Sequence, residues 1–321
     1  MELRQLRAVE AVTRHRHFTR AAEELHVAQS ALSHQIRRLE QELGTALFER
    51  TSRRVSPTEA GQAIAARARR VLAEVDAARQ EVDELRGVLR GRIWIGALLP
   101  AGGLDVPGLL AGFSEAHPGV EVGLREGIAG DMLRFLAADE LDAAFCLLSG
   151  EVPDDLAVER LSEEEAVAAF APGRAPAGPH VGVADLRERT IVATRRGSGI
   201  TAAVEQLFAD ADERLHLSLE SGDPFLLRSL AAGGFATAIL PRSLTAMEGP
   251  AIEVRSLDPA VRLPVALVWR RERDAPPAAR TFIDFVRRET ALAGGRSNAS
   301  GATLDVLRAA RGSGSAAHSQ P

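Results

Sequence analysis

Apolar residues recur every three or four positions at the start of the chain, with polar residues between them, as in short amphipathic helices. A tight break separates two of these helices. Small side chains at Ala21 and Ala22 allow helices to cross closely, and Val27 is expected to fill the gap. The pattern predicts a helix-turn-helix, whose second helix lies in the DNA major groove. The apolar stripes are Leu3, Leu6, Val9 and Val12; Ala21, Ala22 and Leu25; and Leu32, Ile36 and Leu39.

The polar face of the second helix of this motif carries side chains suited to DNA. Gln matches the edge of adenine, Arg the edge of guanine, and Ser the phosphate. A solvated face without a partner is the alternative for such a stripe. The candidate contacts on this face are Gln29, Ser30, Ser33, His34, Arg37 and Arg38.

A short basic segment follows Gly44, which is expected to end that helix in a left-handed conformation. It predicts a small hairpin, or wing, whose arginines reach the DNA backbone or minor groove. A solvated loop is the alternative, but the position directly after a helix-turn-helix favours the wing. The candidate wing contacts are Arg50, Arg53 and Arg54.

A long helix over residues 58–90 carries a heptad repeat, with apolar positions in alternating steps of four and three. This period predicts pairing with a second copy, so that a homodimer presents two recognition helices to two half-sites. Packing on the protein's own second domain is the alternative. The seam is Ile64, Ala68, Val71, Val75, Ala78, Val82, Leu85 and Leu89.

From residue 91 onward, short apolar runs alternate with amphipathic helices, which predicts an α/β domain with a parallel sheet. The series repeats after residue 155, which suggests two lobes with a crevice between them. The Gly-, Ser- and Ala-rich tail 294–321 is expected to be disordered. The predicted strands are 92–97, 120–126, 142–148, 156–161, 166–171, 190–194, 216–220, 235–240 and 265–270, and the helices are 106–116, 131–138, 200–211, 224–232 and 278–293.

Charge is distributed unevenly along the chain. The net charge is −5, but residues 1–90 hold 16 arginines and 13 acidic residues, whereas the remainder holds 23 arginines and 31 acidic residues. There is no lysine. A basic first part joined to an acidic remainder is expected of a DNA-binding module with a separate second domain.

Cys146 is the only cysteine, so the chain cannot form an intramolecular disulfide, as expected in a reducing cytosol. A buried core thiol is favoured over a redox sensor, because no second cysteine could resolve an oxidised one. No signal peptide or membrane helix is predicted, so the protein is expected in the cytoplasm without a membrane partner.

The segment FTRAAEELHVAQSALSHQIRRLEQELGTALFERTSRRVSPTEAG, followed by the heptad helix and two α/β lobes, resembles the LysR-type transcriptional regulators. The match is dense over residues 1–65 and then continues in architecture and short pieces such as AHPGVEV and ADELDAAF. The resemblance implies a winged helix-turn-helix (1–57), a dimerising linker helix (58–90) and a two-lobed, periplasmic-binding-protein-like effector domain (91–293). Lobe I would comprise about 91–161 and 269–293, and lobe II about 162–268.

The resemblance also implies homodimers or homotetramers that act on promoter DNA, with RNA polymerase as a further candidate partner. A small-molecule effector is expected, with no other cofactor and no metal. One departure is Ala28, where the family commonly has Ser. Without that hydroxyl the helix would lose about 0.5–2 kcal/mol of capping unless Ser30 substitutes.

Effectors of open α/β sheets bind at the carboxyl ends of the strands. The family often has Ser or Thr in the first two such loops, but here LLPAGG and GIAG carry no hydroxyl. The third, RRGSGIT, lies at a predicted helix start that favours an anion, although a solvated turn with a cap is equally compatible. We expect a partly apolar ligand with one anionic end held by lobe II. The candidate residues are Leu99, Pro100, Ala101, Ile128, Ala129, Arg196, Ser198, Thr201 and Ser221.

Two other functions compete with a DNA-binding regulator. An enzyme is disfavoured, because the chain has no GxxxxGK[ST] loop, no GxSxG elbow and no metal-ligand spacing among its histidines. A solute-binding protein with an added N-terminus is disfavoured by the missing export signal. The prediction is therefore a transcriptional regulator and not an enzyme.

Overall fold

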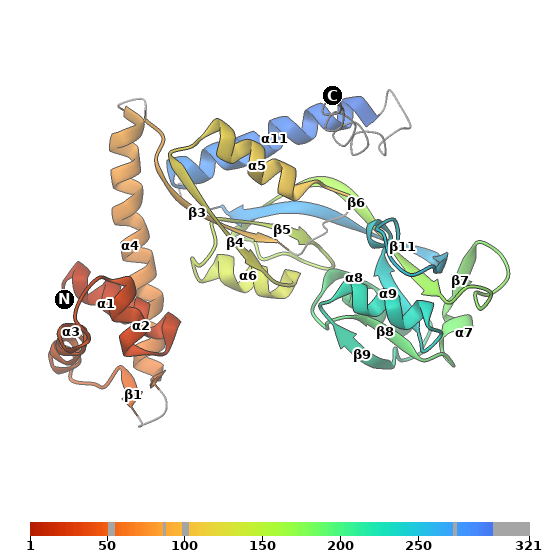
Figure 1. Cartoon of the computed structure of the whole chain (residues 1–321), viewed down its shortest axis with the longest axis horizontal. Helices are drawn as coiled ribbons and strands as arrows, with labels where there is room; N and C mark the ends of the chain where they lie inside the picture. Colours follow the sequence, from red (N-terminus) through yellow and green to blue (C-terminus); the bar gives the residue numbers. More distant parts are fainter. Residues whose placement is uncertain (51–54, 86–87, 98–102, 272–274, 298–321) are drawn as a thin grey trace, which may run out of the picture.

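The computed structural model describes residues 1–50, 55–85, 88–97, 103–271 and 275–297. Helices of the N-terminal part gather around one end of a long helix, and an elongated α/β domain extends from that helix (Figure 1). The predicted contacts Arg53, Arg54, Leu99, Pro100 and Ala101 lie outside the described residues, as does the tail from residue 298.

The N-terminal part is a winged helix-turn-helix, as predicted. Its buried core joins all three short helices, the hairpin and the start of the long helix. The elements are α1 (Leu3–His15), α2 (Phe18–Glu24), α3 (Gln29–Leu43), β1 (Phe48–Arg50), β2 (Val55–Pro57) and α4 (Glu59–Leu85).

The two ends of α3 differ in how well they are capped. Gly44 has φ 68° and its N–H donates to Glu40 O, which confirms the predicted helix stop. At the other end Ala28 is the N-cap, and no side chain accepts a hydrogen bond from the first turn there. The expectation for Val27 is wrong, because its side chain is 38% exposed. The chain reverses instead at His26, with φ 53°, and the Val27 N–H donates to Ala22 O at 3.0 Å.

The long helix α4 packs within the chain at two places along its length. Near its start, Ala65 is buried in the helix-turn-helix core, and Ala68 is also buried within the chain. Farther along, Ala77 and Gln80 are buried, and the Gln80 side chain accepts a hydrogen bond from Ala278 N at 3.4 Å. The predicted seam is therefore shorter than eight positions, since Ala68 packs within the chain and Leu89 follows the end of the helix at Leu85.

The second part is an α/β domain built on a nine-stranded sheet in the order β4-β3-β5-β11-β6-β10-β8-β9, with β7 paired to β11. The strands are β3 (Gly91–Ala97), β4 (Val120–Glu126), β5 (Ala143–Leu147), β6 (Leu156–Phe170), β7 (His180–Gly182), β8 (Ile191–Thr194), β9 (Leu217–Ser221), β10 (Thr237–Pro241) and β11 (Glu253–Arg270). The helices are α5 (Val106–Ala116), α6 (Ala129–Ala137), α7 (Val183–Leu186), α8 (Gly199–Asp210), α9 (Pro224–Ala232), α10 (Arg242–Thr245) and α11 (Pro277–Ser297).

The sheet is mixed and not parallel throughout, because β11 pairs antiparallel with β5 and β6, and β6 pairs antiparallel with β10. The two strands predicted at 156–161 and 166–171 are one continuous strand, β6. The last strand begins at Glu253 and not at Val265, so β6 and β11 form a long antiparallel ladder that runs through both lobes (Figure 1). The closing helix α11 continues past residue 294, where the tail was predicted to begin.

Two cores lie in each lobe, one on each face of the sheet. In lobe I, α5 and α11 cover one face, with Phe113, Phe145 and Phe282 in edge-to-face contact, and α6 covers the other. In lobe II, α7 and α8 cover one face, and α9 and α10 cover the other. Burial of apolar faces on both sides explains why the strands read as continuous apolar runs.

A cluster of ion pairs joins α4 to lobe I at the end of α6. Asp139 accepts from Arg70 Nε at 2.8 Å and pairs with Arg270 at 3.4 Å. Beside it, Glu140 pairs with Arg69 at 3.3 Å and with Arg125 at 2.5 Å. The Asp139 side chain is only 4% exposed, so this contact is shielded from solvent far more than an ordinary surface pair.

The uncapped start of α3 yields the first prediction. Replacing Ala28 with Ser supplies an acceptor for the free N–H groups of the first turn, and we expect the free energy of unfolding to rise by about 0.5–2 kcal/mol. Urea unfolding of both proteins measures the change. Ala31→Ser, on the exposed side of the same helix, is the matched control and should give no stabilisation. Equal effects of the two substitutions would show that capping is not the cause.

Candidate functional site

The recognition face of α3 is presented largely as predicted. The side chains of Gln29, Ser30, His34, Arg37 and Arg38 are exposed. The prediction that Ser33 lies on this exposed face is wrong. Ser33 is only 7% exposed and so lies on the packed side of the helix beside Leu32 and Ile36. Its carbonyl oxygen accepts a hydrogen bond from Arg37 Nε at 3.3 Å, which holds the Arg37 side chain along the helix.

The orientation of this face is fixed from behind by the core. Leu32, Ile36 and Leu39 are fully buried, at intervals of four and three residues. The Phe18 and Phe48 rings meet edge to face with centroids 6.0 Å apart, so the start of α2 and the start of the hairpin pack together. A helix anchored at three buried positions can turn little about its own axis, which keeps the polar residues pointing outward.

The hairpin is tied to the recognition helix by polar contacts that the sequence pattern did not reveal. The Glu40 carboxylate accepts hydrogen bonds from Leu47 N at 2.9 Å and Phe48 N at 3.3 Å. At the same end of the hairpin, where the chain leaves β2, the Thr58 hydroxyl donates to Ala46 O at 2.8 Å and accepts from Gly61 N at 3.0 Å. Glu40 and Thr58 are therefore positioning residues that set where the wing lies relative to α3.

The wing itself is a two-stranded antiparallel hairpin, which confirms the predicted form. Phe48 pairs with Pro57, and Arg50 pairs with Val55. Arg50 is the last residue of β1, next to the segment that holds Arg53 and Arg54. The fold therefore places Arg50 on a hairpin whose base is fixed against the recognition helix.

The two predicted cleft loops of the effector domain touch each other. Gly130 N donates to Gly197 O at 3.4 Å, and a Cβ at Gly197 would lie 3.2 Å from Ile128 Cδ1. Ile128 is the N-cap of α6 and Ala129 its first residue, so the start of α6 in lobe I meets the loop before α8 in lobe II. The structure thus brings Ile128 and Ala129 together with the loop of Arg196 and Ser198.

The predicted anion-binding groups of that loop already have protein partners. The Arg196 guanidinium pairs with Glu220 at 2.9 Å and also with Glu205. Ser198 and Thr201 are buried, and their hydroxyls hydrogen-bond the Thr194 hydroxyl at 2.6 and 2.9 Å. These contacts cap α8 and join it to β8, so a ligand at this position would have to displace them.

Ser221, the remaining predicted effector residue, ends β9, and its hydroxyl accepts from Asp223 N at 3.0 Å. Arg195 is different from its neighbour Arg196, because its guanidinium is exposed and has no hydrogen-bond or ion-pair partner among the described residues, although its carbonyl oxygen accepts from Ser198 N at 3.0 Å. Its guanidinium lies against Gly222, where an added Cβ would come within 3.3 Å. Of the two arginines in the loop, Arg195 is therefore the one with free charge.

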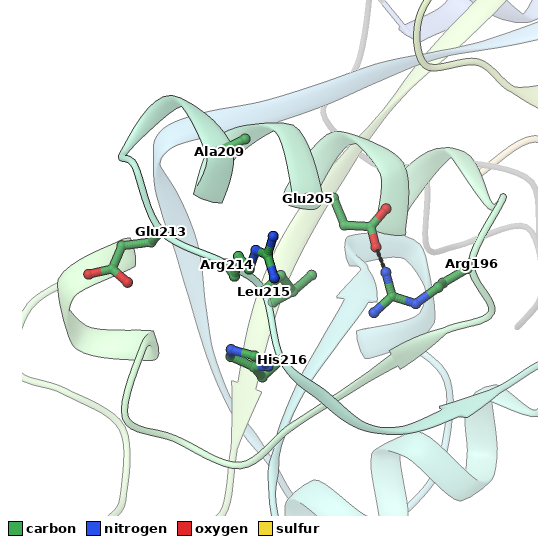
Figure 2. Close-up of a pocket in the computed structure, with 7 residues that line it drawn as sticks. All are labelled: Arg196, Glu205, Ala209, Glu213, Arg214, Leu215 and His216. Atoms are coloured by element: carbon green, nitrogen blue, oxygen red, sulfur yellow. Dashed lines mark hydrogen bonds and ion pairs between the residues drawn. The ribbon is translucent and has the colours of Figure 1, made fainter.

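A cavity of about 420 Å³ lies beside Arg196, between α8 and the segment that leads into β9 (Figure 2). Its charged groups largely neutralise one another within the protein. Arg196 faces Glu205 across an ion pair, and Glu213 pairs with Arg187 at 3.4 Å. Arg214 and His216 complete the basic side of the cavity. Three of its charged groups, Arg196, Glu205 and Glu213, thus already have partners of opposite charge.

Cys146 lies in β5 and is 2% exposed, which confirms the prediction of a buried thiol. It packs with Met132, Leu136 and Ala266 under α6. Burial raises the pKa of the Cys146 thiol to about 12, so the reactive thiolate is scarce at neutral pH.

Comparison with known proteins identifies the class. The model described as "Bacterial regulatory helix-turn-helix protein, lysR family" matches residues 3–62, and the "LysR substrate binding domain" matches residues 86–291. The chain belongs to the LysR family of transcriptional regulators, with an N-terminal DNA-binding domain and a C-terminal effector-binding domain.

Relatives match over nearly the whole chain. The RuBisCO operon transcriptional regulator of Allochromatium vinosum is 31% identical over 303 residues, which cover 91% of this chain and 97% of that protein. A full-length OxyR variant from Pseudomonas aeruginosa superposes with a TM-score of 0.69 at 26% identity, over 89% of this chain and 95% of that one. Full-length CbnR complexed with its target DNA gives a TM-score of 0.61 at 25% identity, over 90% and 99%.

The described residues contain neither a membrane-spanning helix nor a cluster of metal ligands. No helix there combines the length and apolar character needed to cross a membrane. No group of three or more His, Cys, Asp and Glu side chains in that part of the chain is arranged to hold a metal ion.

The buried thiol yields the second prediction. At pH 8 the native protein should react with iodoacetamide far more slowly than the urea-unfolded protein, because the Cys146 pKa of about 12 leaves little thiolate and the core excludes the reagent. Mass spectrometry of timed samples measures the labelling. As pH rises toward 12 the difference should shrink. Rapid labelling of the native protein at pH 8 would contradict the buried, inert position.

Proposed function

We propose that this regulator binds double-stranded promoter DNA as a homodimer or a homotetramer and responds to a small-molecule effector in its C-terminal domain. The observation that carries the proposal is the exposed face of Gln29, Ser30, His34, Arg37 and Arg38 on α3, next to the hairpin that ends at Arg50. The CbnR relative with bound target DNA supports the same use of this part of the chain. Arg at the edge of guanine and Gln at the edge of adenine would supply sequence recognition.

The pairing surface that we propose lies on α4. Beyond the helix-turn-helix core, Val71, Val82 and Leu85 are 42%, 50% and 89% exposed, which is unusual for large apolar residues. Val75 and Ala78 complete the steps of four and three between them. At 100° per residue, Val82 lies about 200° around the helix from Gln80, so the seam points away from lobe I. A second copy would bury it in a coiled coil.

The remaining parts of the proposal follow from the class. Regulators of transcription work in the cytoplasm, and RNA polymerase is the natural further partner at a promoter. The relatives that match are transcriptional regulators, so we propose that the chain has no catalytic activity and needs no cofactor other than its effector. A gel shift with the DNA upstream of its own gene tests binding directly, and it should weaken strongly as salt increases.

The recognition face yields the third prediction. Arg38→Ala should weaken operator binding by about tenfold or more, because a charge-assisted contact to phosphate or base is lost. Fluorescence anisotropy at several salt concentrations measures both the affinity and the salt slope. If Arg38 contacts phosphate, the slope should fall by about one and all sequences should weaken alike. Arg288→Ala, an exposed arginine on α11, is the control and should bind as the parent does.

The α4 seam yields the fourth prediction. Val82→Glu places a charge in the proposed interface, and we expect the sedimentation-equilibrium mass to fall toward that of one chain. Operator affinity should fall with it, because two half-sites are no longer bound together. Glu81→Gln, one residue away on an exposed polar position, is the matched control. An unchanged mass for Val82→Glu would place the dimer interface elsewhere.

A further inference from the structure

His34 lies in the middle of the recognition face of α3, and its imidazole has no protein partner. It is exposed, and it forms no hydrogen bond or ion pair with the described residues. The residues one turn away on the same side of the helix are Ser30, Ala31, Arg37 and Arg38. None of them carries a carboxylate, so an imidazolium at this position finds no anion within a turn of its own helix.

His34 is also the only residue of the recognition face whose charge changes near neutral pH. The chain contains no lysine, so the other side-chain cations of this face are arginines, which stay protonated at any pH at which the protein is folded. The amino group of Met1 pairs with Glu42 at 2.6 Å. Glu42 follows His34 by eight residues, about 12 Å along the helix axis. Between pH 6.0 and 7.5 the charge of the recognition face therefore depends on His34.

The charged groups of the neighbouring elements do not supply an anion for the imidazole either. The titratable residues of α1, α2, the turns beside them and β1 are Glu2, Arg4, Arg7, Glu10, Arg14, His15, Arg16, His17, Arg20, Glu23, Glu24, His26, Glu49 and Arg50. Among the described residues no carboxylate forms an ion pair with His34, and Glu24 is already held by Arg14 at 2.5 Å. The acidic effector domain lies on the other side of α4 from α3 (Figure 1). An anion that pairs with His34 must therefore belong to a partner molecule.

We propose that His34 binds DNA as an imidazolium, so that formation of the complex takes up one proton from solvent. The acceptor is a phosphate oxygen or the N7 or O6 atom of a guanine, which attract a cationic donor in the same way. In the free protein the nearest charges are those of Arg37 and Arg38, which disfavour a third positive charge, whereas DNA supplies negative charge. The inference rests on the proposed function, because it requires that this face binds DNA. The regulator would then hold its operator more tightly as the pH falls.

The test uses the full-length chain and fluorescence anisotropy with a labelled duplex from the DNA upstream of its own gene, at constant ionic strength. From pH 7.5 to pH 6.0 the association constant of the parent should increase by about tenfold, because uptake of one proton permits at most about tenfold per pH unit. His34→Gln should remove this pH dependence and bind at both pH values about as the parent does at pH 7.5. His34→Arg carries a permanent charge, and it should bind at both pH values about as tightly as the parent does at pH 6.0.

Two other histidines of the motif provide matched controls. His17 and His26 are exposed but do not belong to α3, so His17→Gln and His26→Asn should keep the pH dependence of the parent. Asn is used at position 26 because it tolerates the left-handed backbone there, with φ 53°. A random duplex of the same length separates the two acceptors. A phosphate contact gives the same pH dependence on both duplexes, whereas a guanine contact gives it on the upstream duplex alone.

Equal pH dependence in the parent and in His34→Gln would overturn the inference, and so would a parent affinity that stays constant between pH 7.5 and 6.0. Either result leaves the proposed function intact, because the parent still binds the upstream duplex. Absence of binding by the parent at both pH values, at low salt, would instead remove the proposed function and this inference together. Thermal midpoints measured at both pH values check that substitutions at the exposed position 34 leave the fold unchanged.

Discussion

The packing of α4 is the constraint on which the rest of the molecule depends. Its first turns bury Ala65 in the helix-turn-helix core, and its later turns carry Gln80 against lobe I. One rigid helix therefore sets the position of α3 relative to the effector domain. Most of the stability of helices in folded proteins comes from packing of their apolar faces, so these contacts at both ends fix the position of α4.

Charged residues of α4 attach the helix to the effector domain through ion pairs. Arg70 reaches the nearly buried carboxylate of Asp139, and Arg69 reaches Glu140. Asp139 itself has φ 54°, a left-handed conformation that Asp tolerates better than most residues, so its backbone turns the end of α6 while its carboxylate faces the arginines. Removing one partner of such a shielded pair costs much more than removing a surface charge.

Strong apolar periodicity makes most helices and strands predictable from the sequence. The polar contacts between residues distant in the sequence are not predictable in this way. The helix-turn-helix, the wing and most strands of lobe I follow from apolar spacing that a helix or strand must obey. The continuity of β6 was missed because Glu163, Glu164 and Glu165 interrupt its apolar pattern. The sheet accepts two of them, since Ser243 and Arg242 bind the carboxylates of Glu164 and Glu165. The ion pair of Arg196 is likewise not predictable from the sequence pattern, because its partner Glu220 is distant in the sequence.

The β11 strand gives the effector domain a direct mechanical link to the DNA-binding part. Near its middle, Arg262 lines a cavity between the lobes, and at its end Arg270 pairs with Asp139, the same carboxylate that binds Arg70 of α4. A strand fixed on both edges by β5 and β6 cannot shift at one point without moving at the next. A change in lobe angle would therefore reach α4 through the Asp139 carboxylate, which lies beside the contacts of Glu140 with Arg69 and of Ala278 with Gln80. Such a change alters DNA binding only to the extent that an effector favours one of two arrangements over the other.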